Sequence, residues 1–294
     1  MMVKRNLIWS AFVLIVSLFI LAMAGCAKTP APQAETPAPA NKDVILATTT
    51  STQDSGLLDV LIPAFEKKTG YKIKTIAVGT GQALAMGEKG EADVLLVHAP
   101  DAEKKVVDSG AAINRQLVMH NDFVVIGPTD DPAHVKGQPV KDAFAAIAKA
   151  GAPFISRGDN SGTHQMEKKL WQQAGVTPSG AWYQEVGAGM GQTLNVANEK
   201  KGYTLTDRAT YLAQKKNLNL DILVEGDAKL LNIYHVMEVN QQRFAKVNIA
   251  GAKAFSDFLL SPEGQAIIAD FGKDKFGQPL FFADGGKTDK DFGL

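Results

Sequence analysis

Short apolar runs alternate with amphipathic segments along most of the chain, and this pattern predicts strands followed by helices. Apolar residues fill positions 44–47 and 123–126 and, after Asp93, the rest of positions 93–97, as expected of buried strands. Between residues 57 and 65, apolar residues instead recur at helical spacing ahead of Gly70, a residue type that commonly ends helices. Strands that alternate with helices imply an α/β fold, with largely parallel sheets covered by helices.

The same rhythm continues to the end of the chain. Further strands are expected at residues 72–78, 154–156, 203–205, 222–224 and 233–239, and further helices at residues 103–107, 140–150, 162–174 and 247–271. In sheets of this kind, ligands bind at the carboxyl ends of the strands, in the loops that lead into helices. A binding site is therefore expected in those loops.

The N-terminal part of the chain follows a different pattern. Two basic residues precede an apolar stretch at residues 7–22, and Cys26, the only cysteine, follows it. This arrangement is typical of a signal peptide at residues 1–25 followed by a lipid-modified cysteine. The alternative is an uncleaved anchor, but the stretch is shorter than the ~20 residues of a membrane span. Residues 26–43, rich in proline and alanine, favour an extended tether. We expect an extracytoplasmic lipoprotein, in the periplasm or at the outer face of the cell membrane.

Composition narrows the classes of function. The chain has 294 residues, 45% of them hydrophobic, with 31 acidic and 31 basic side chains. That length suits one large domain or two lobes, and the balanced charge argues against a nucleic-acid binder. The five histidines form no metal-binding signature, and no G-x-S-x-G elbow occurs. We expect a monomeric binding protein with no cofactor, no metal-cation site and no enzymatic activity.

Hydroxyl-bearing residues fill the first strand-to-helix loop. Residues 48–52 read Thr-Thr-Thr-Ser-Thr directly after the first predicted strand. Helix N-termini attract anions through their free N–H groups and their dipole, and hydroxyls add further donors. A helix cap would explain one hydroxyl, but five favour ligand contact. Thr49, Thr50 and Ser51 are candidates, and Thr80, between two glycines after the next predicted strand, is another.

A later loop carries the most specific motif. Residues 156–164 read Ser-Arg-Gly-Asp-Asn-Ser-Gly-Thr-His and open a predicted helix. The guanidinium of Arg157 can give two parallel N–H···O bonds to one oxyanion. Asp159 can orient Arg157, cap the helix or accept a proton from the ligand. The other candidates at the start of the helix are Ser161, Gly162 and Thr163.

Two more turns lead into predicted helices. One is glycine-rich, at residues 187–193, and the other reads Thr-Leu-Thr-Asp-Arg at residues 204–208. In the second turn, Asp207 is expected to cap the helix and Thr206 to contact the ligand. Several turns of this kind in one chain predict an anion enclosed by hydroxyl and N–H donors.

Taken together, these motifs resemble those of the tungstate-binding proteins of bacterial ABC importers. The resemblance rests on the Thr-Thr-Thr-Ser run, on S-R-G-D-N-S-G-T-H and on Y-T-L-T-D-R-A-T-Y at residues 203–211, and it extends from about residue 44 to about residue 267. It implies a two-lobed periplasmic-binding-protein fold, each lobe a mixed, mostly parallel sheet flanked by helices. It also implies that residues 48–51 and Arg157 hold an oxyanion in the cleft, for delivery to an ABC permease in the membrane.

The resemblance also suggests where the lobes divide and which ligands compete. We expect the first lobe at residues 44–127 plus 232–294 and the second at residues 128–231. Tungstate is the expected ligand, and molybdate has the same shape and charge. Phosphate is the runner-up, because R-x-D-x-S-G-T also resembles phosphate-binding proteins, in which the aspartate accepts the proton of the ligand.

Overall fold

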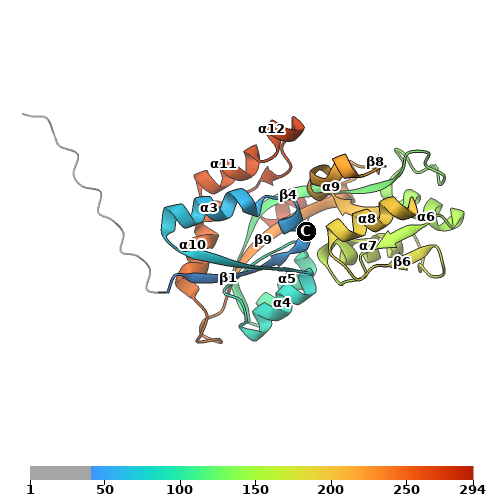
Figure 1. The fold of residues 1–294 in the computed structure, drawn as a ribbon. Helices are drawn as coiled ribbons and strands as arrows, with labels where there is room; N and C mark the ends of the chain where they lie inside the picture. The colour runs from blue at the N-terminus through green and yellow to red at the C-terminus, as the bar shows by residue number, and fades with distance from the viewer. Residues whose placement is uncertain (1–40, 294) are drawn as a thin grey trace, which may run out of the picture. The chain divides into compact units, whose positions relative to one another are not determined.

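A mixed β-sheet forms the centre of the structure, a computed structural model that describes residues 41–293 (Figure 1). The expected signal peptide, Cys26 and nearly all of the expected tether lie outside the described residues. No helix within the described part of the chain is long and apolar enough to cross a membrane.

The strands of the sheet follow the order β10-β4-β9-β3-β1-β2. Strand β1 (Asp43–Thr49) lies between β2 (Lys72–Val78) and β3 (Val94–Val97) and runs parallel to both. Strand β9 (Leu231–Val239) pairs antiparallel with β3 and with the long strand β4 (Ala112–Pro128). The short strand β10 (Phe282–Ala283) pairs with β4 at the edge. The carboxyl ends of β1, β2 and β3 therefore point the same way.

Strand β4 extends beyond this set of strands. Its C-terminal half pairs antiparallel with β7 (Thr204–Asp207) and β8 (Leu220–Val224). Two further strands, β5 (Phe154–Ser156) and β6 (Tyr183–Glu185), form a separate parallel pair. The sequence pattern predicts only residues 123–126 of β4, because polar residues interrupt the apolar run before that point.

Helices flank the sheets on both sides (Figure 1). They are α2 (Thr50–Asp54), α3 (Leu58–Thr69), α4 (Thr80–Lys89), α5 (Pro100–Asp108), α6 (Val140–Ala150), α7 (Gly162–Gln173), α8 (Met190–Lys200), α9 (Arg208–Gln214), α10 (Ile249–Leu260), α11 (Pro262–Asp270) and α12 (Lys273–Phe276), with 3₁₀ turns η1 (Lys215–Asn217), η2 (Ala228–Leu230) and η3 (Asp289–Phe292). The helical pattern at residues 247–271 is two helices, because Ser261 caps α11 and Pro262 occupies its first turn.

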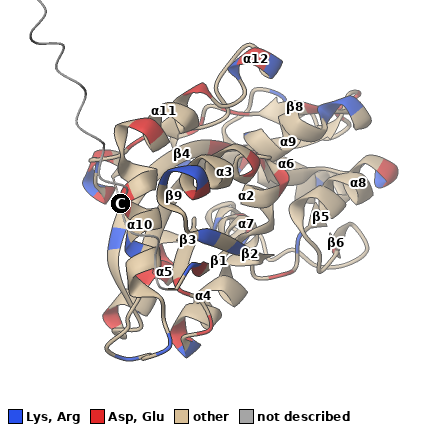
Figure 2. Cartoon of the chain, turned by 60° about the vertical axis from the view of Figure 1, so that its left-hand side comes forward, with Lys and Arg blue, Asp and Glu red and all other residues tan. Residues whose placement is uncertain are grey.

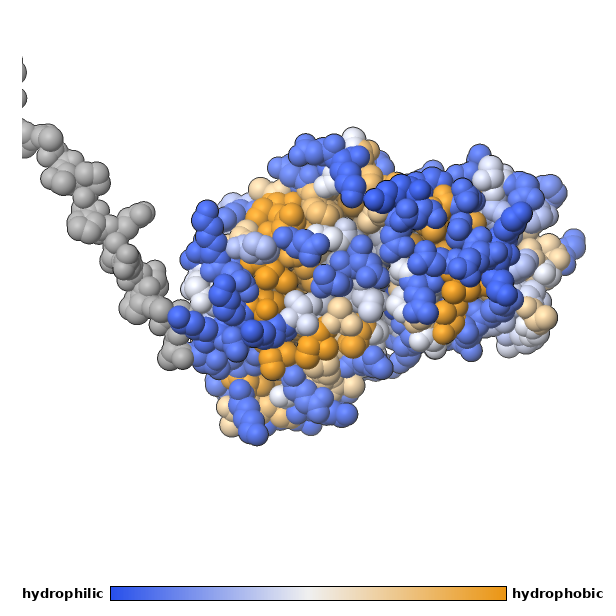
Figure 3. Space-filling model, viewed as in Figure 1, coloured by the Kyte–Doolittle hydropathy of each residue, from blue (hydrophilic) through white to orange (hydrophobic). Residues whose placement is uncertain are grey.

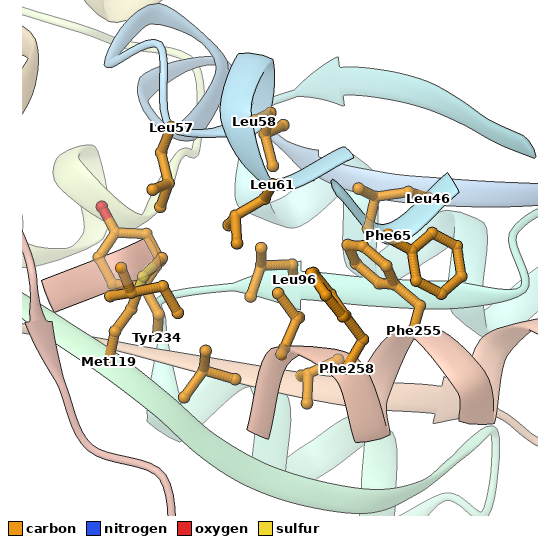
Figure 4. Packing of buried hydrophobic residues seen from close by; sticks show 14 of the residues in the cluster. Leu46, Leu57, Leu58, Leu61, Phe65, Leu96, Met119, Tyr234, Phe255 and Phe258 are labelled. Carbon is orange, nitrogen blue, oxygen red and sulfur yellow. The ribbon is translucent and has the colours of Figure 1, made fainter. Parts of the chain in front are cut away.

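The buried apolar residues form separate clusters on either side of the midpoint of β4. One cluster joins strand residues such as Leu46 to Phe65 of α3 and Phe255 of α10, whose rings meet edge to face at 5.1 Å (Figure 4). Another joins Phe154 of β5 to Trp171 of α7, at 5.0 Å. The predicted fold class, a periplasmic-binding-protein fold with mixed sheets flanked by helices, is confirmed. The lobe boundaries stay a prediction.

The surface is mixed in charge and hydropathy. In the view of Figure 2, basic and acidic residues intersperse along the outer helices, with both signs on α12 and at the end of α8. In Figure 3, hydrophobic residues form patches bordered by hydrophilic ones. Among the described residues, the exposed large hydrophobic side chains are Val60, Ile76 and Phe282. The apolar residues are thus used mainly in the interior.

Candidate anion-binding site

Turns from four places in the sequence meet around Arg157. Its Nη2 donates to the hydroxyl of Thr50 at 2.9 Å, and its Nε donates to the carbonyl of Ala188 at 3.2 Å. On the other side, the backbone N–H of Gly162 donates to the hydroxyl of Thr80 at 2.9 Å. The structure therefore brings together the predicted loops after β1, β2 and β5 and the glycine-rich turn before α8.

Arg157 is buried to an unusual degree for a charged side chain. Only 1% of its surface is exposed, and its Nη1 has no hydrogen-bond partner within the described part of the protein. A buried cationic donor without a partner is unfavourable unless another group satisfies it. The geometry therefore leaves one arm of the guanidinium available to a ligand.

Asp159 is the carboxylate beside this guanidinium, and both of its oxygens are engaged. Its Oδ2 accepts a short hydrogen bond from Nη2 of Arg157, and its Oδ1 accepts from the backbone N–H of Ser161 at 3.1 Å. Of the three roles that the sequence leaves open for Asp159, this geometry shows that of orienting Arg157, whereas the side chain that caps α7 is that of Ser161.

Four of the predicted hydroxyl residues share one hydrogen-bonding pattern. Each accepts a bond from an N–H group: Thr49 from Thr52, Thr50 from Arg157, Thr80 from Gly162 and Ser161 from His164. Accepting an N–H bond fixes the position of the hydroxyl oxygen and leaves its own proton free to donate. The hydroxyl of Thr163, in a residue only 1% exposed, has no partner among the described residues.

The remaining predicted residues have different surroundings. The hydroxyl of Thr206 donates to the carbonyl of Asp207 at 3.1 Å, so its proton is already used. Gly162 supplies space, because a Cβ there would lie 2.8 Å from ring atoms of His98. Thr206 therefore offers no free hydroxyl proton, and Gly162 leaves room for the ring of His98.

The helix geometry adds positive potential. Helices α4, α7 and α8 begin at these turns, with N-caps at Gly79, Ser161 and Gly189. The N-terminus of a helix carries a partial positive charge and unpaired N–H groups. Three such ends around Arg157 favour an anion.

Two buried titratable residues at this site are missing from the predicted ligand set. His98 directly follows β3, and its Nε2 lies 3.2 Å from Thr49 Oγ1 and 3.3 Å from Ser51 Oγ. Burial and the charge of Arg157 lower the pKa of His98 to about 4, so the ring is neutral. Burial raises the pKa of Asp207, which caps α9, to about 6. The rule that ligands bind at the carboxyl ends of strands could have identified His98, because it directly follows β3, whereas a search for histidine metal motifs misses it.

A buried carboxylate accepts a hydrogen bond from Ser156, the residue that precedes Arg157. Glu167 of α7 accepts hydrogen bonds from the hydroxyl of Ser156 at 2.7 Å, from Tyr183 at 2.8 Å and from Trp171 at 3.1 Å. Burial raises the pKa of Glu167 to about 7, although these donors oppose the shift. The residue before Arg157 is therefore tied to the core. Within residues 41–293, no cluster of three His, Cys, Asp or Glu residues could hold a metal ion.

Comparison with known proteins shows the family of the chain. Residues 32–263 match the model of a PBP superfamily domain. A tungstate-binding protein TupA of Peptoclostridium acidaminophilum is 48% identical over 270 residues, which are 90% of this chain and 94% of the relative.

Two solved structures are also similar. One, described as the tungstate ABC transporter from Geobacter sulfurreducens, is 50% identical, covers 78% of this chain and 99% of its own, and superposes with a TM-score of 0.73. The tungstate-binding protein TupA from Desulfovibrio alaskensis G20 is 48% identical, covers 83% and 99% of the two chains, and has a TM-score of 0.69. The chain therefore belongs to the PBP superfamily and, within it, to the family of these tungstate-binding proteins.

Proposed function

We propose that this protein captures tungstate outside the cytoplasm and delivers it to an ABC importer. The observation that carries the proposal is the guanidinium of Arg157, buried at 1% exposure with an unpartnered Nη1. Around it lie hydroxyls whose oxygens are fixed and whose protons are free. Such a set of donors complements a tetrahedral oxyanion, and the relatives named above are tungstate-binding proteins.

The ligand contacts follow from which donors are free. We assign the main charge interaction to Arg157, and direct hydroxyl contacts to Thr50, Ser51, Thr80, Ser161 and Thr163. Thr49 and Gly162 support these contacts through His98. We assign no ligand contact to Thr206, because its proton already bonds a carbonyl.

We propose that the site discriminates between oxyanions by whether it offers an acceptor for a proton on the ligand. Phosphate near neutral pH carries a proton that needs an acceptor, whereas tungstate and molybdate carry none. Each oxygen of Asp159 already accepts one hydrogen bond, and these bonds hold Arg157 and the loop in place. We propose that Asp159 serves these two partners and not a ligand proton. We therefore assign the site to the fully deprotonated dianion, with molybdate as the alternative of equal shape and charge.

Capture would proceed by closure of two lobes around the anion. The contacts between Arg157 and Thr50, and between Gly162 and Thr80, join residues of the two predicted lobes. The lobes would be linked by β4 and by the chain leading into β9. Closure of this kind buries the ligand and creates one surface that the permease can distinguish from the open form.

Calorimetric titration of the mature protein with tungstate, molybdate, phosphate and sulfate tests the assignment. We expect tungstate and molybdate to bind much more tightly than phosphate, which carries a proton. Sulfate, a smaller dianion without a proton, shows how far size contributes. Phosphate binding tighter than tungstate binding would establish the phosphate alternative. Absence of binding for all four anions would remove the oxyanion function.

The membrane attachment is a separate proposal that rests on the sequence around Cys26. We propose that Cys26 is acylated and anchors the monomer to the membrane. Cys26→Ser should then move the protein out of membrane fractions or leave the precursor uncleaved. A variant that matures and fractionates like the wild type would contradict the anchor and leave the binding function untouched.

A further inference from the structure

A chain of buried polar side chains crosses strands β4 and β9 and ends at the hydroxyl run. Asn121 of β4 faces Asn232 of β9 as a cross-strand pair. The Nδ2 of Asn121 donates to Asp207 Oδ1 at 3.4 Å, and the Nδ2 of Asn232 donates to Asn121 Oδ1 at 2.7 Å. Both asparagines are 1% exposed, so each amide depends on protein partners.

The direction of every bond in this chain follows from Asp207. Its Oδ1 also accepts from the backbone N–H of Thr210 at 2.8 Å, so it acts as an acceptor. Asn121 must therefore turn its amide nitrogen toward Asp207 and its oxygen toward Asn232. Asn232 in turn presents its nitrogen to Asn121, which leaves Asn232 Oδ1 as a buried acceptor.

His98 is a buried polar residue that lines the same cavity as this remaining acceptor. Its Nδ1 and Asn232 Oδ1 are both buried, and neither has a hydrogen-bond partner among the described residues. Both residues line the same cavity of about 300 Å³. Burial and the charge of Arg157 lower the pKa of His98 to about 4, and the side chain of Asn232 opposes that shift. An oxygen that faces a ring N–H has this effect.

We propose that this chain holds His98 as the neutral Nδ1–H tautomer, whose bare Nε2 accepts the hydroxyl proton of Thr49 and leaves the proton of Ser51 for the oxyanion. His98 is then a positioning residue, which acts through the hydroxyl run and does not touch the ligand. This inference rests on the proposed oxyanion function, because it says how one part of that site is arranged.

The surroundings of the two hydroxyls decide which one donates to His98. Thr49 Oγ1 already contacts Thr52 N, Thr52 Oγ1 and Ser51 Oγ at 2.7–3.2 Å, besides His98 Nε2. Ser51 Oγ has contacts only with Thr49 and His98 within the described residues, at 3.2 and 3.3 Å. One neutral imidazole nitrogen accepts one proton. Thr49 Oγ1 lies slightly nearer to Nε2 than Ser51 Oγ does, so we assign the donated proton to Thr49 and leave that of Ser51 available.

The tautomer can be measured directly on the mature protein. Nitrogen-15 NMR of the imidazole at about pH 7 distinguishes a protonated Nδ1 from a protonated Nε2. We expect Nδ1 to carry the proton both without ligand and with tungstate bound, and the absence of the signal in His98→Gln assigns it. A spectrum with the proton on Nε2 would overturn the proposal.

Variants test the chain of bonds and its effect on binding. Asn232→Leu removes the acceptor and should shift the Nδ1–H population toward a mixture. Tyr234→Phe is the matched control, because Asn232 Nδ2 also donates to the Tyr234 hydroxyl at 2.9 Å, a branch that does not lead to His98. An unchanged tautomer in Asn232→Leu, or the same change in Tyr234→Phe, would contradict the relay.

Affinity separates positioning from simple packing. His98→Leu should weaken tungstate binding by about three- to thirtyfold, the range of one lost hydrogen bond. His98→Gln should recover most of that loss, because its amide oxygen can accept the Thr49 proton. Binding within about twofold of wild type in His98→Leu would overturn the positioning role. If wild type binds no oxyanion, the proposed function fails, whereas binding with an Nε2–H tautomer removes this inference alone.

Discussion

The turn after β5 and the turn after β7 each place an arginine beside the start of a helix, yet the two arginines are satisfied in opposite ways. Arg208 donates to both oxygens of Asp122, at 2.8 and 2.6 Å, and to Glu225 at 2.7 Å. These carboxylates raise the pKa of Arg208 well above its usual value. Arg157 has one carboxylate partner, Asp159, and one arm without a partner among the described residues.

The difference gives a criterion for telling a structural arginine from a candidate binding one. Arg208 has a 20% exposed side chain and is charge-compensated twice, so an added anion would have to displace a carboxylate. Arg157 is almost fully buried and surrounded by hydroxyls and helix N-termini, which can accommodate further negative charge. Unused donor capacity, and not charge alone, is therefore the feature on which the proposed ligand site rests.

Of the changes that test this comparison, replacing Arg157 should have the largest effect on tungstate affinity. Removing one partner of a desolvated charge pair costs about 2–5 kcal/mol, so Arg157→Gln should weaken tungstate binding roughly thirtyfold to several thousandfold. Arg157→Lys should recover only part, since lysine keeps the charge but loses the forked geometry. Calorimetric titration measures both variants, with circular dichroism as the folding control. Binding by Arg157→Gln within about threefold of wild type would remove Arg157 as the principal ligand.

Glu167, the buried carboxylate that accepts from Ser156, should make the free energy of unfolding depend on pH. Asp122 is paired with the cation Arg208, whereas Glu167 accepts hydrogen bonds only from neutral donors. Burial raises the pKa of Glu167 to about 7. A raised folded-state pKa stabilises the fold fully below about pH 4.5, and this contribution is lost as pH rises through about 7. Glu167→Gln is neutral at every pH, so wild type should lose on the order of 3 kcal/mol relative to it across that window.

Denaturant unfolding of both proteins at acidic and mildly alkaline pH measures this difference. Asp142, in the first turn of α6, offers a matched Asp142→Asn control at the surface. The two unfolding free energies should diverge for Glu167→Gln and run parallel for the control. A constant difference between wild type and Glu167→Gln across pH would show that Glu167 keeps an ordinary pKa.

Two buried threonines allow a hydroxyl with an unbonded proton to be compared with one whose proton is already bonded. The hydroxyl of Thr163 has no partner among the described residues, whereas that of Thr206 bonds a carbonyl. A hydrogen bond to a charged group is worth about 1.5–3 kcal/mol, so Thr163→Val should weaken tungstate binding tenfold or more. Thr206→Val should leave affinity nearly unchanged. Equal losses in the two variants would mean that free hydroxyls do not identify the contacts.

Much of the fold and part of the site follow from the sequence. The pattern at residues 72–78 and 140–150 predicts β2 and α6 at their observed bounds, because one face of each is regularly apolar. The first half of β4 is missed, because its exposed polar residues hide the strand pattern.

The site is predictable where a motif is local and hidden where partners are distant. Arg157 and Thr163 belong to one nine-residue motif, and the strand-end rule places it at a helix start. The unused arm of Arg157 and the role of His98 depend on Thr50, Asn232 and Thr49, which lie far away in the chain. Only packing brings these groups together, so their hydrogen bonds cannot be read from spacing.

Replacing Arg208 should give the smallest effect and complete the comparison. Arg208→Gln leaves Asp122 and Glu225 without their cation, but Glu225 is 55% exposed and Asp122 24%, so water compensates part of the loss. We expect a decrease of about 1–2 kcal/mol in the free energy of unfolding, between the values for surface and buried pairs. Tungstate affinity should stay within about threefold of wild type, because no free donor is removed. Thermal unfolding with and without tungstate measures both quantities, since the ligand-induced stabilisation reports affinity. A loss of affinity comparable with that of Arg157→Gln would show that Arg208 also serves the anion, and the distinction between saturated and unsaturated arginines would fail.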